Sequence, residues 1–400
     1  MVAAQPSEEA TTCEMYWRVG LRNINRDPKC EPAEFRIPQI PLPLSNPTTT
    51  PQVNQRPAVK AISFDAKESI SVIEVDAPGV PGLGEAKVAV HRVGICGTDT
   101  SAYLGKFPFF QFPRTPGHEL GVEVLEVGDG VTNVKPGDAC SVEPYMNDPE
   151  SYSSKRGRPN CCDNLEVIGV HCNGGMCEEF IIPAHKLHVG NGLKYDQLAL
   201  VETLAIGCHA VNRANPQKGD NVLVIGCGPI GLTVVEFLKI RGCRTIMMDM
   251  NQDRLEFAKN EMGVDSCVQV QKDGSELERL SKLTDGNLCE TVVDATGNKF
   301  SMSRALEFVA FAGKLVYVGV TGEEVSFPHP LMHRREMTIM SSRNALAEDF
   351  TQIIEVMKQG KINTDAWITH RTDMEKLAGD FPTYLDPASK VLKAMIHIPA

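Results

Sequence analysis

The pattern of hydrophobic and polar positions divides the 400-residue chain into three parts. Residues 1–57 are rich in proline and contain no sustained apolar period, so we expect a disordered N-terminal extension. From Val59 onwards, short runs alternate between apolar and polar positions and are separated by glycine-containing turns, which predicts a β-rich module. Its expected strands span residues 61–64, 86–93, 120–127, 139–143 and 178–182.

The pattern changes to a helical period over residues 196–214, and Gly219-Asp220 then introduces a continuous apolar run at 221–225. Strands and helices alternate from that point, which is typical of a doubly wound parallel sheet. The further strands are expected at residues 245–249, 291–294, 314–319 and 337–341. The tail carries a helical pattern near 348–359 and a final strand at 391–398, and we expect it to return to the β-rich module.

These patterns predict an α/β protein with two folded domains. We assign residues 58–200 and 345–400 to the β-rich domain and residues 201–344 to the parallel-sheet domain. Two domains also suit the length of the chain, since a domain holds roughly 150 residues.

Composition narrows the functional classes. The formal net charge of −11 would repel a phosphate backbone, so nucleic acid is not an expected partner. The longest apolar stretch, residues 222–237, is interrupted by glycine and proline, which favours a strand, a turn and a helix over a membrane span. The 13 cysteines are scattered, and no basic segment followed by an apolar one opens the sequence, so we expect a cytoplasmic protein without a membrane partner.

A glycine-rich motif follows the strand expected at 221–225. It has the form G-x-G-x-x-G and contains the candidate cofactor residues Gly226, Gly228, Pro229, Ile230 and Gly231. One glycine allows a tight turn, one lets the backbone approach a pyrophosphate, and one permits close packing of helix on strand. The start of the helix then faces the phosphates. The motif predicts a dinucleotide site, and a glycine-rich turn that binds something else or nothing is the alternative.

An acidic residue stands where a dinucleotide site needs one. Asp249 ends the next expected strand, about 20 residues after the motif, where its carboxylate can accept hydrogen bonds from ribose hydroxyls. The same carboxylate would repel a 2′-phosphate, so NAD is the expected cofactor. Arg254, which we also assign to the cofactor site, is close in sequence and leaves NADP as the alternative.

Two short motifs in the β-rich module carry metal-binding side chains. Cys96 lies in the segment Gly94–Asp99, and His118 and Glu119 end the segment Pro116–Glu119. Thiolate, imidazole and carboxylate groups are ligands that zinc accepts, and a catalytic zinc site keeps one position open for substrate. Either motif alone would be ambiguous, because a single cysteine or histidine is usually a core or surface residue.

The order of these features closely resembles the zinc-containing medium-chain alcohol and polyol dehydrogenases over about residues 59–400. The resemblance rests on the sequences GICGTD and PGHE, the central G-x-G-x-x-G and the returning tail. It implies that the β-rich domain is a GroES-like catalytic domain and that the other is a Rossmann NAD-binding domain. It further implies that Cys96 and His118 bind zinc, that Asp99 orients His118, and that Glu119 or Glu202 is the third ligand.

The resemblance also implies catalytic roles for Thr98 and Glu119. Thr98 corresponds to the relay hydroxyl that passes the alcohol proton towards the nicotinamide ribose, and Glu119 is either a direct zinc ligand or one that exchanges with water. The zinc ion lowers the pKa of the substrate hydroxyl. The alternative for Thr98 is a hydroxyl that bonds its own backbone. Arg343 is expected at the cofactor pyrophosphate.

The chain departs from the family pattern in two places. The last glycine of the family's GHE-x-x-G would fall at Val122, whereas here glycine stands at Gly121. The family's structural-zinc lobe carries four cysteines, and the matching positions read Asn147, Glu150, Ser153 and Cys161. Three thiolates are missing, so we expect one catalytic zinc per chain and no structural zinc. Nearby cysteines are expected to pack or to remain reactive thiols, and these are Cys162, Cys172 and Cys177.

A narrower resemblance concerns the substrate. Residues 108–114, 157–162, 167–171 and 342–345 are similar to segments of bacterial sugar-acid dehydrogenases of the L-galactonate or L-gulonate 5-dehydrogenase type. We therefore expect an oxidoreductase that transfers a hydride from a secondary alcohol of a sugar acid or polyol to NAD. Arg114 or Arg343 could bind a sugar-acid carboxylate, with a surface position as the alternative for Arg114.

Other activities fit the same motifs. A sorbitol-type polyol dehydrogenase, a butanediol-type dehydrogenase and a threonine-type dehydrogenase are the alternatives, each with a small hydroxylated metabolite as partner. A non-catalytic dinucleotide-binding relative is a further alternative, but it would have no physical need for an open metal site. Proteins of this family commonly form dimers or tetramers through the sheet of the cofactor domain, so the resemblance implies a homo-oligomer.

Overall fold

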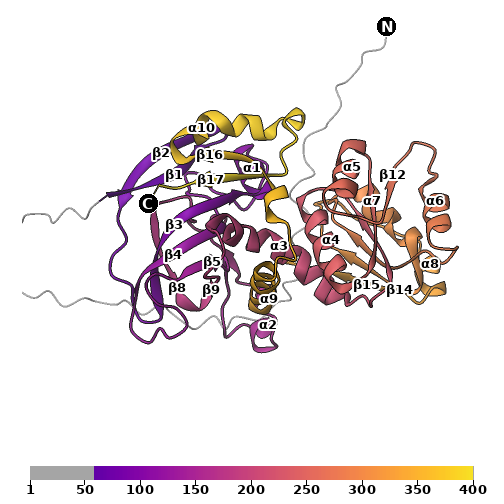
Figure 1. Ribbon diagram of the computed structural model, residues 1–400, viewed down its shortest axis with the longest axis horizontal. Helices are drawn as coiled ribbons and strands as arrows, with labels where there is room; N and C mark the ends of the chain where they lie inside the picture. Colours follow the sequence, from indigo (N-terminus) through magenta and orange to yellow (C-terminus); the bar gives the residue numbers. More distant parts are fainter. Residues whose placement is uncertain (1–57, 400) are drawn as a thin grey trace, which may run out of the picture. The chain divides into compact units, whose positions relative to one another are not determined.

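Two sheets organise the chain in the computed structural model, which describes residues 58–399 (Figure 1). One is a seven-stranded sheet of mixed direction and the other a six-stranded parallel sheet, accompanied by two small two-stranded sheets. The α/β fold class expected from the sequence is confirmed. The expected disordered extension, residues 1–57, lies outside the described residues.

The seven-stranded sheet is built mainly from the β-rich part of the sequence. Its strands follow the order β16-β17-β3-β4-β5-β9, and β8 pairs with β3 outside this path. The strands are β3 (Glu85–Ile95), β4 (Glu119–Val127), β5 (Ala139–Val142), β8 (Glu179–Pro183), β9 (Leu187–Val189), β16 (Ile368–Asp373) and β17 (Lys393–His397). Buried and half-buried residues alternate along most of β3, because successive side chains point to opposite faces of the sheet.

The tail of the chain pairs with this sheet. Strand β17 lies antiparallel to β3, with Ala394 opposite Ile95. The hairpin of β1 (Ala58–Ala66) and β2 (Ser69–Asp76) also meets the tail, since the ring of Phe64 contacts that of Phe381 edge-on at 5.5 Å between centroids. The beginning and the end of the described chain therefore share one hydrophobic core.

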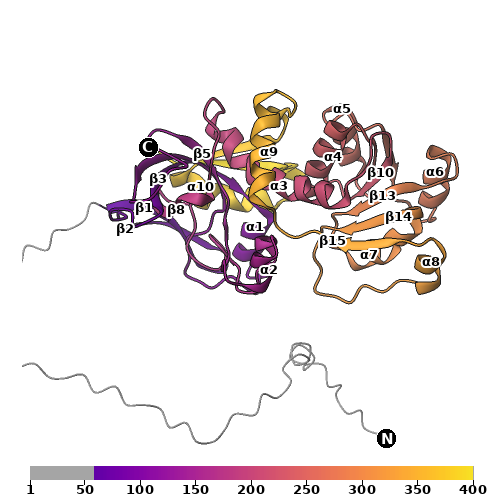
Figure 2. The same cartoon turned by 90° about the horizontal axis from the view of Figure 1, so that it is seen from below.

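The six-stranded sheet is parallel throughout and has the order β12-β11-β10-β13-β14-β15. This is the 3-2-1-4-5-6 order of a dinucleotide-binding sheet, and the labelled strands β10, β13, β14 and β15 lie side by side in Figure 2. The strands are β10 (Asn221–Ile225), β11 (Arg244–Asp249), β12 (Ser266–Gln269), β13 (Cys289–Asp294), β14 (Val309–Tyr317) and β15 (Thr338–Ser341).

Both faces of the parallel sheet are covered by helices. Val222 and Val224 of β10 belong to one core with α4 (Pro229–Arg241) and α5 (Gln252–Asn260). Leu223 and Ile225 belong to the core on the other face, to which α6 (Glu276–Leu283) contributes. Burial on both faces explains why β10 is a continuous apolar run in the sequence instead of an alternating one.

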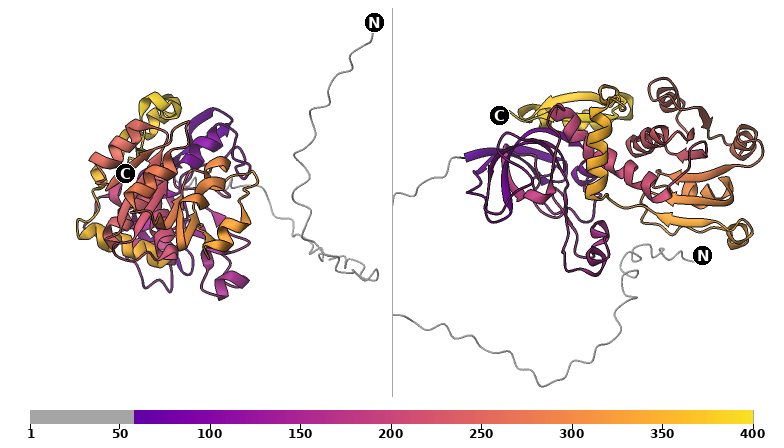
Figure 3. Two further views of the ribbon diagram at one scale, coloured as in Figure 1. Left: turned by 90° about the vertical axis from the view of Figure 1, so that its right-hand side faces the viewer. Right: turned by 60° about the horizontal axis from the view of Figure 1, so that its bottom comes forward.

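Helix α3 (Tyr195–Ala214) is buried along most of its length and packs on α4, on β4 and on α9 (Ala347–Lys358). The contact between α3, in magenta, and α9, in gold, is seen in the right-hand view of Figure 3. A helix that is apolar nearly all round needs partners on every side, and α3 finds them in both sheets. This position allows α3 to carry side chains to the candidate active site.

The structure differs from the expected elements in several places. Strand β14 begins at Val309, before the position expected from the sequence. Its first half was not predicted because Ala312, which has a left-handed backbone with φ of 57°, and the following Gly313 interrupt the apolar pattern. Strands β2, β12 and β16 were not predicted, since the polar and apolar alternation of β2 shifts phase at its centre and the other two strands are short or polar. Among the described residues, no helix combines the length and the apolarity needed to cross a membrane.

Candidate active site

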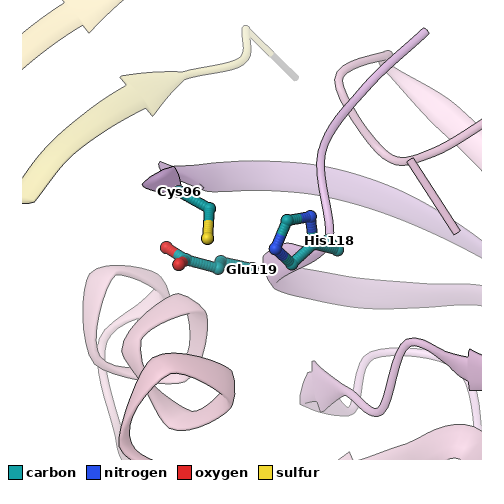
Figure 4. Close-up of side chains that lie close together, drawn as sticks. All are labelled: Cys96, His118 and Glu119. Atoms are coloured by element: carbon teal, nitrogen blue, oxygen red, sulfur yellow. The ribbon is translucent and has the colours of Figure 1, made fainter. Parts of the chain in front are cut away.

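Cys96, His118 and Glu119 come together at one end of strands β3 and β4. The two strands pair antiparallel with Gly94 opposite Glu119, so Cys96, just beyond the end of β3, lies beside the start of β4. The ligand atoms of the three side chains all lie within 4.8 Å of one another, and Figure 4 shows them pointing towards a common point. The two motifs that the sequence places apart therefore form one cluster.

Glycine is required where the carboxylate crosses the neighbouring strand. A Cβ atom on Gly94 would collide with Oε2 of Glu119, so the glycine makes room for this side chain. Glu119 is 1% exposed and His118 is 5% exposed, and both side chains are therefore largely shielded from water.

The cluster fits a zinc ion in chemistry and in charge. Sulfur, nitrogen and oxygen donors are ligands that zinc accepts, and the three side chains of the cluster offer one of each. Burial alone would lower the pKa of His118, but the neighbouring Cys96, Asp99 and Glu202 raise it well above its usual value. The surroundings of this imidazole thus favour a positive charge.

Asp99 contacts the backbone of Cys96, a candidate metal ligand. Its Oδ2 accepts a hydrogen bond of 2.9 Å from the backbone N of Cys96, which fixes the first turn of α1 (Gly97–Tyr103). The expected hydrogen bond from His118 to Asp99 is not formed among the described residues, where Oδ1 of Asp99 is buried without a partner. Asp99 therefore orients the Cys96 loop directly, and its charge acts on His118 through space.

Lys393 is a member of the site that the sequence analysis missed. Its Nζ lies 2.7 Å from both carboxylate oxygens of Glu119 and donates to the carbonyl of Ile95 at 3.2 Å. Burial would raise the pKa of Glu119, but the Lys393 ammonium lowers it and keeps the carboxylate ionised. The only sequence signal was a charged residue within the otherwise apolar final strand.

Glu202 projects from α3 and is held by a tyrosine. The hydroxyl of Tyr145, on β6 (Tyr145–Met146), donates to Oε1 of Glu202 at 2.6 Å, and both side chains are buried. Glu202 is not part of the group whose ligand atoms lie within 4.8 Å, although its charge acts on His118. Nothing in the sequence around Tyr145 singled it out.

Thr98 lies in the first turn of α1, two residues after Cys96, and is half-buried. The Thr98 hydroxyl makes no hydrogen bond to any group of the described residues, so the alternative in which it bonds its own backbone is not observed. The hydroxyl is therefore available to another partner near the candidate metal ligands.

The glycine-rich motif has three different environments at its three glycines. Gly226 has a φ of +100°, Gly228 has open space where a side chain would begin, and a Cβ on Gly231 would collide with the carbonyl of Gly226. These correspond to the turn, the backbone approach and the close packing that the motif requires. Pro229 and Ile230 begin α4 after Gly228, whose residue type offers no side-chain cap, so the first amides of this helix remain open to an anion.

Asp249 fastens the glycine-rich loop. It ends β11, and its Oδ2 accepts a hydrogen bond of 2.6 Å from the backbone N of Cys227, while Oδ1 accepts one of 2.8 Å from Asn251. Each oxygen still has a lone pair for a ribose hydroxyl. Arg254, in the first turn of α5, has an exposed side chain.

The two arginines considered for a carboxylate differ in their surroundings. The guanidinium of Arg114 donates to the carbonyl of Val170 and lies over the ring of Phe110, at 5.5 Å from its centroid. Arg343 is exposed, and its guanidinium has no hydrogen bond or ion pair within residues 58–399. Arg343 is therefore freer to meet a ligand than Arg114.

Hydrogen bonds stabilise the segment that corresponds to the family's structural-zinc lobe, in which three of the four cysteines are replaced. Asn147 donates to the hydroxyl of Ser154 at 3.1 Å and accepts from Lys186 at 3.2 Å, and Ser151 caps the short helix α2 (Tyr152–Lys155). Cys161 is exposed and Cys162 is buried. Within residues 58–399, the cluster of Cys96 is the only group of three metal-ligating side chains found.

Two family matches cover most of the described chain. The family described as alcohol dehydrogenase GroES-like domain matches residues 82–191, and that described as zinc-binding dehydrogenase matches residues 229–359. L-galactonate-5-dehydrogenase of Escherichia coli strain K12 is 35% identical over 317 residues, covering 79% of this chain and 93% of the relative.

Solved structures show the same fold. The short chain alcohol dehydrogenase (rspB) of E. coli CFT073, complexed with NADH, is 28% identical with a TM-score of 0.79, covering 85% of this chain and 99% of that chain. A putative zinc-binding dehydrogenase of Sinorhizobium meliloti 1021, bound to NADP, is 25% identical with a TM-score of 0.78, covering 86% and 100%. The expected pairing of a GroES-like with a Rossmann fold is confirmed, and the chain belongs to the zinc-binding medium-chain alcohol and polyol dehydrogenases, a family of oxidoreductases.

Proposed function

We propose that this protein oxidises a secondary alcohol of a sugar acid or polyol, with NAD as the hydride acceptor and one zinc ion bound near Cys96. The observation that carries the proposal is the convergence of Cys96, His118 and Glu119, whose ligand atoms lie within 4.8 Å of one another. A zinc ion held there supplies a Lewis acid that lowers the pKa of the substrate hydroxyl.

The side chains of the protein would act as metal ligands, as a counter-charge and as a proton relay. Cys96 and His118 hold the metal, and either Glu119 or Glu202 is the third ligand. Lys393 neutralises Glu119 and restrains it through two hydrogen bonds, which suits a carboxylate that exchanges with water at the metal. The free hydroxyl of Thr98 takes the proton from the substrate and passes it towards the cofactor ribose.

NAD is the proposed cofactor because a carboxylate stands at the end of β11. Asp249 is fixed beside the glycine-rich loop by Cys227, so it cannot easily move away from a 2′-phosphate. The charge of that phosphate would meet the Asp249 carboxylate, whereas two ribose hydroxyls can donate to it. The solved relatives include complexes with NADH and with NADP, and Arg254 is the residue that would favour NADP.

The name of the L-galactonate relative supports a sugar acid as the substrate, and the exposed guanidinium of Arg343 could bind either its carboxylate or the cofactor pyrophosphate. We further propose the domain division 58–200 with 345–400, and 201–344, for the catalytic and NAD-binding domains. A homo-oligomer, either a dimer or a tetramer, is the proposed assembly, with no nucleic acid or membrane partner.

The test is a panel of substrates, with turnover measured by the absorbance of the NADH that forms. Aldonates, polyols, vicinal diols and threonine are offered with NAD and with NADP, with and without a zinc chelator. We expect turnover of an aldonate or polyol with NAD, lost on chelation and regained with zinc. NADH binding without any turnover and without bound zinc would instead identify a non-catalytic dinucleotide-binding protein. Turnover of only diols or threonine would replace the substrate class.

A further inference from the structure

A buried chain of hydrogen bonds joins helix α3 to the segment that carries Arg343. His209 of α3 is 2% exposed, and its Nδ1 lies 2.8 Å from Oδ2 of Asp349 while its Nε2 lies 3.2 Å from Nδ2 of Asn160. Nδ2 of Asn160 also donates to the carbonyl oxygen of Arg343 at 2.9 Å. Residues distant in sequence, from three different segments, thus share one continuous polar network.

The contact with Arg343 fixes the direction of every bond in this network. A carbonyl oxygen can only accept, so the group of Asn160 that faces it must be the amide NH2. The second hydrogen of this NH2 points to Nε2 of His209, which therefore carries no proton. His209 consequently holds its proton on Nδ1 and donates it to Asp349.

Asp349 is the fixed end of the network. Its Oδ1 accepts a hydrogen bond of 2.7 Å from Asn212 of α3, and its Oδ2 accepts one of 2.8 Å from the backbone N of Leu346 at the start of α9. Because two helices hold this carboxylate, His209 and Asn160 have little freedom to rotate. The carbonyl of Arg343 is the other end of the chain.

The segment Ser342–Asn344 has features of a ligand-facing loop. Two buried polar atoms of this segment have no partner among the described residues, namely Oγ of Ser342 and Nδ2 of Asn344. Such atoms are uncommon and indicate a missing partner. Asn344 also has a left-handed backbone, with φ of 52°.

The loop leaves the parallel sheet where nucleotides bind to such sheets. Strand β15 ends at Ser341, so the loop begins at the carboxyl end of a parallel strand. In open α/β sheets this edge is where ligands bind. The guanidinium of Arg343 is exposed at the same place and has no protein partner within the described chain.

We propose that Asn160 and His209 are positioning residues for the dinucleotide. They hold the backbone of Arg343, so that residues 342–344 present their polar groups to the bound cofactor, and they do not touch the cofactor themselves. The inference rests on the proposed function, since it requires a dinucleotide at this edge of the sheet.

The Asn160→Asp variant tests the hydrogen bond between Asn160 and the Arg343 carbonyl, which we call the tether, with almost no change in side-chain volume. It places a carboxylate oxygen against the Arg343 carbonyl and removes both donated hydrogen bonds. We expect the dissociation constant of NADH, measured by fluorescence titration, to rise about five- to tenfold, as for loss of one or two hydrogen bonds. Zinc content and kcat at saturating cofactor should stay at wild-type values, while KM for the cofactor rises.

Two variants separate positioning from a general structural effect. Asn147→Asp changes an asparagine of the same lobe that bonds Ser154 and Lys186, and it should leave NADH binding unchanged. Asn160→Ala removes the tether without adding a charge, and it should weaken NADH binding in the same direction as Asn160→Asp. Unchanged NADH affinity in both Asn160 variants would overturn the proposal.

A double-mutant cycle shows whether Asn160 acts through Arg343. We expect Arg343→Ala to weaken NADH binding, and Asn160→Asp to add much less in that background than in the wild-type protein. Fully additive effects, or wild-type NADH affinity in Arg343→Ala, would contradict the positioning role. Neither of those results would affect the substrate panel, which tests the dehydrogenase activity separately.

Discussion

The Lys393→Met variant would remove the ammonium group that pairs with the carboxylate of Glu119 in a nearly dry environment and leave His118 as its remaining cationic neighbour. The side chains of Lys393 and Glu119 are 3% and 1% exposed, and Nζ lies 2.7 Å from both oxygens. Removing one partner of a buried ion pair costs about 3–5 kcal/mol, because the other charge stays buried and unpaired. We expect the metal-free protein to lose about this much free energy of unfolding.

A bound zinc ion should offset part of this loss, because it gives Glu119 a new cationic neighbour. The assay is urea unfolding of chelator-treated protein, before and after zinc is added back. The measured quantity is the urea concentration at the midpoint of unfolding. The midpoint should rise more on zinc addition in Lys393→Met than in the wild type. This difference separates a role at the metal site from ordinary packing of β17.

Two controls sharpen the experiment. Lys376→Met removes an exposed ion pair with Asp373, whose side chains are 70% and 45% exposed, and should change stability little. The double variant Glu119→Gln/Lys393→Met should be more stable than Lys393→Met, since no charge is left unpaired. A metal-free Lys393→Met protein that unfolds at the wild-type midpoint would refute the reasoning.

Cys96→Ser should abolish turnover and leave the NADH dissociation constant nearly unchanged in fluorescence titration, and a folded variant that no longer binds NADH would contradict this. Asp249→Ser should raise the NADP-to-NAD ratio of kcat/KM about tenfold, equivalent to ~1.4 kcal/mol, and initial rates with both cofactors test it. Burial would raise the pKa of Glu143, but His188 and Lys186 lower it below its unfolded value near 4.5, so its contribution to stability is lost as the pH falls through the folded pKa. Acid unfolding followed by circular dichroism should therefore be less steep below about pH 5 in Glu143→Gln, and parallel curves would disprove it. Metal analysis should give about one zinc per chain, and two tightly held ions would reveal a second site.

Short sequence motifs were sufficient to predict site residues at positions where the backbone geometry allows few residue types. The glycines of the motif at 226–231 have the turn, open space and close packing that the pattern demands, because only glycine fits Gly226 and Gly231 without strain or collision. Cys96 and His118 were predicted from their residue types and from the motifs GICGTD and PGHE, and the antiparallel pairing of β3 and β4 brings the two motifs together.

Contacts that depend on tertiary structure were not predictable in the same way. Lys393 looked like a charged residue in a final strand, and its contact with Glu119, 274 positions away, depends on the pairing of β17 with β3. Tyr145 reaches Glu202 from a strand of two residues, too short for a periodic signal. Strand β2 was missed because the alternation of its polar and apolar residues shifts phase between Val72 and Ile73.

The late pairing of β17 has a consequence for how the protein is made. Translation proceeds at about 5–20 residues per second, so β3 and β4 leave the ribosome well before Lys393 is added. Until then, residues 92–95 of β3 lack the neighbour that β17 provides and form an open strand edge, a common starting point for aggregation. A nascent chain that stalls before β17 is made should therefore become a substrate for chaperones and proteases.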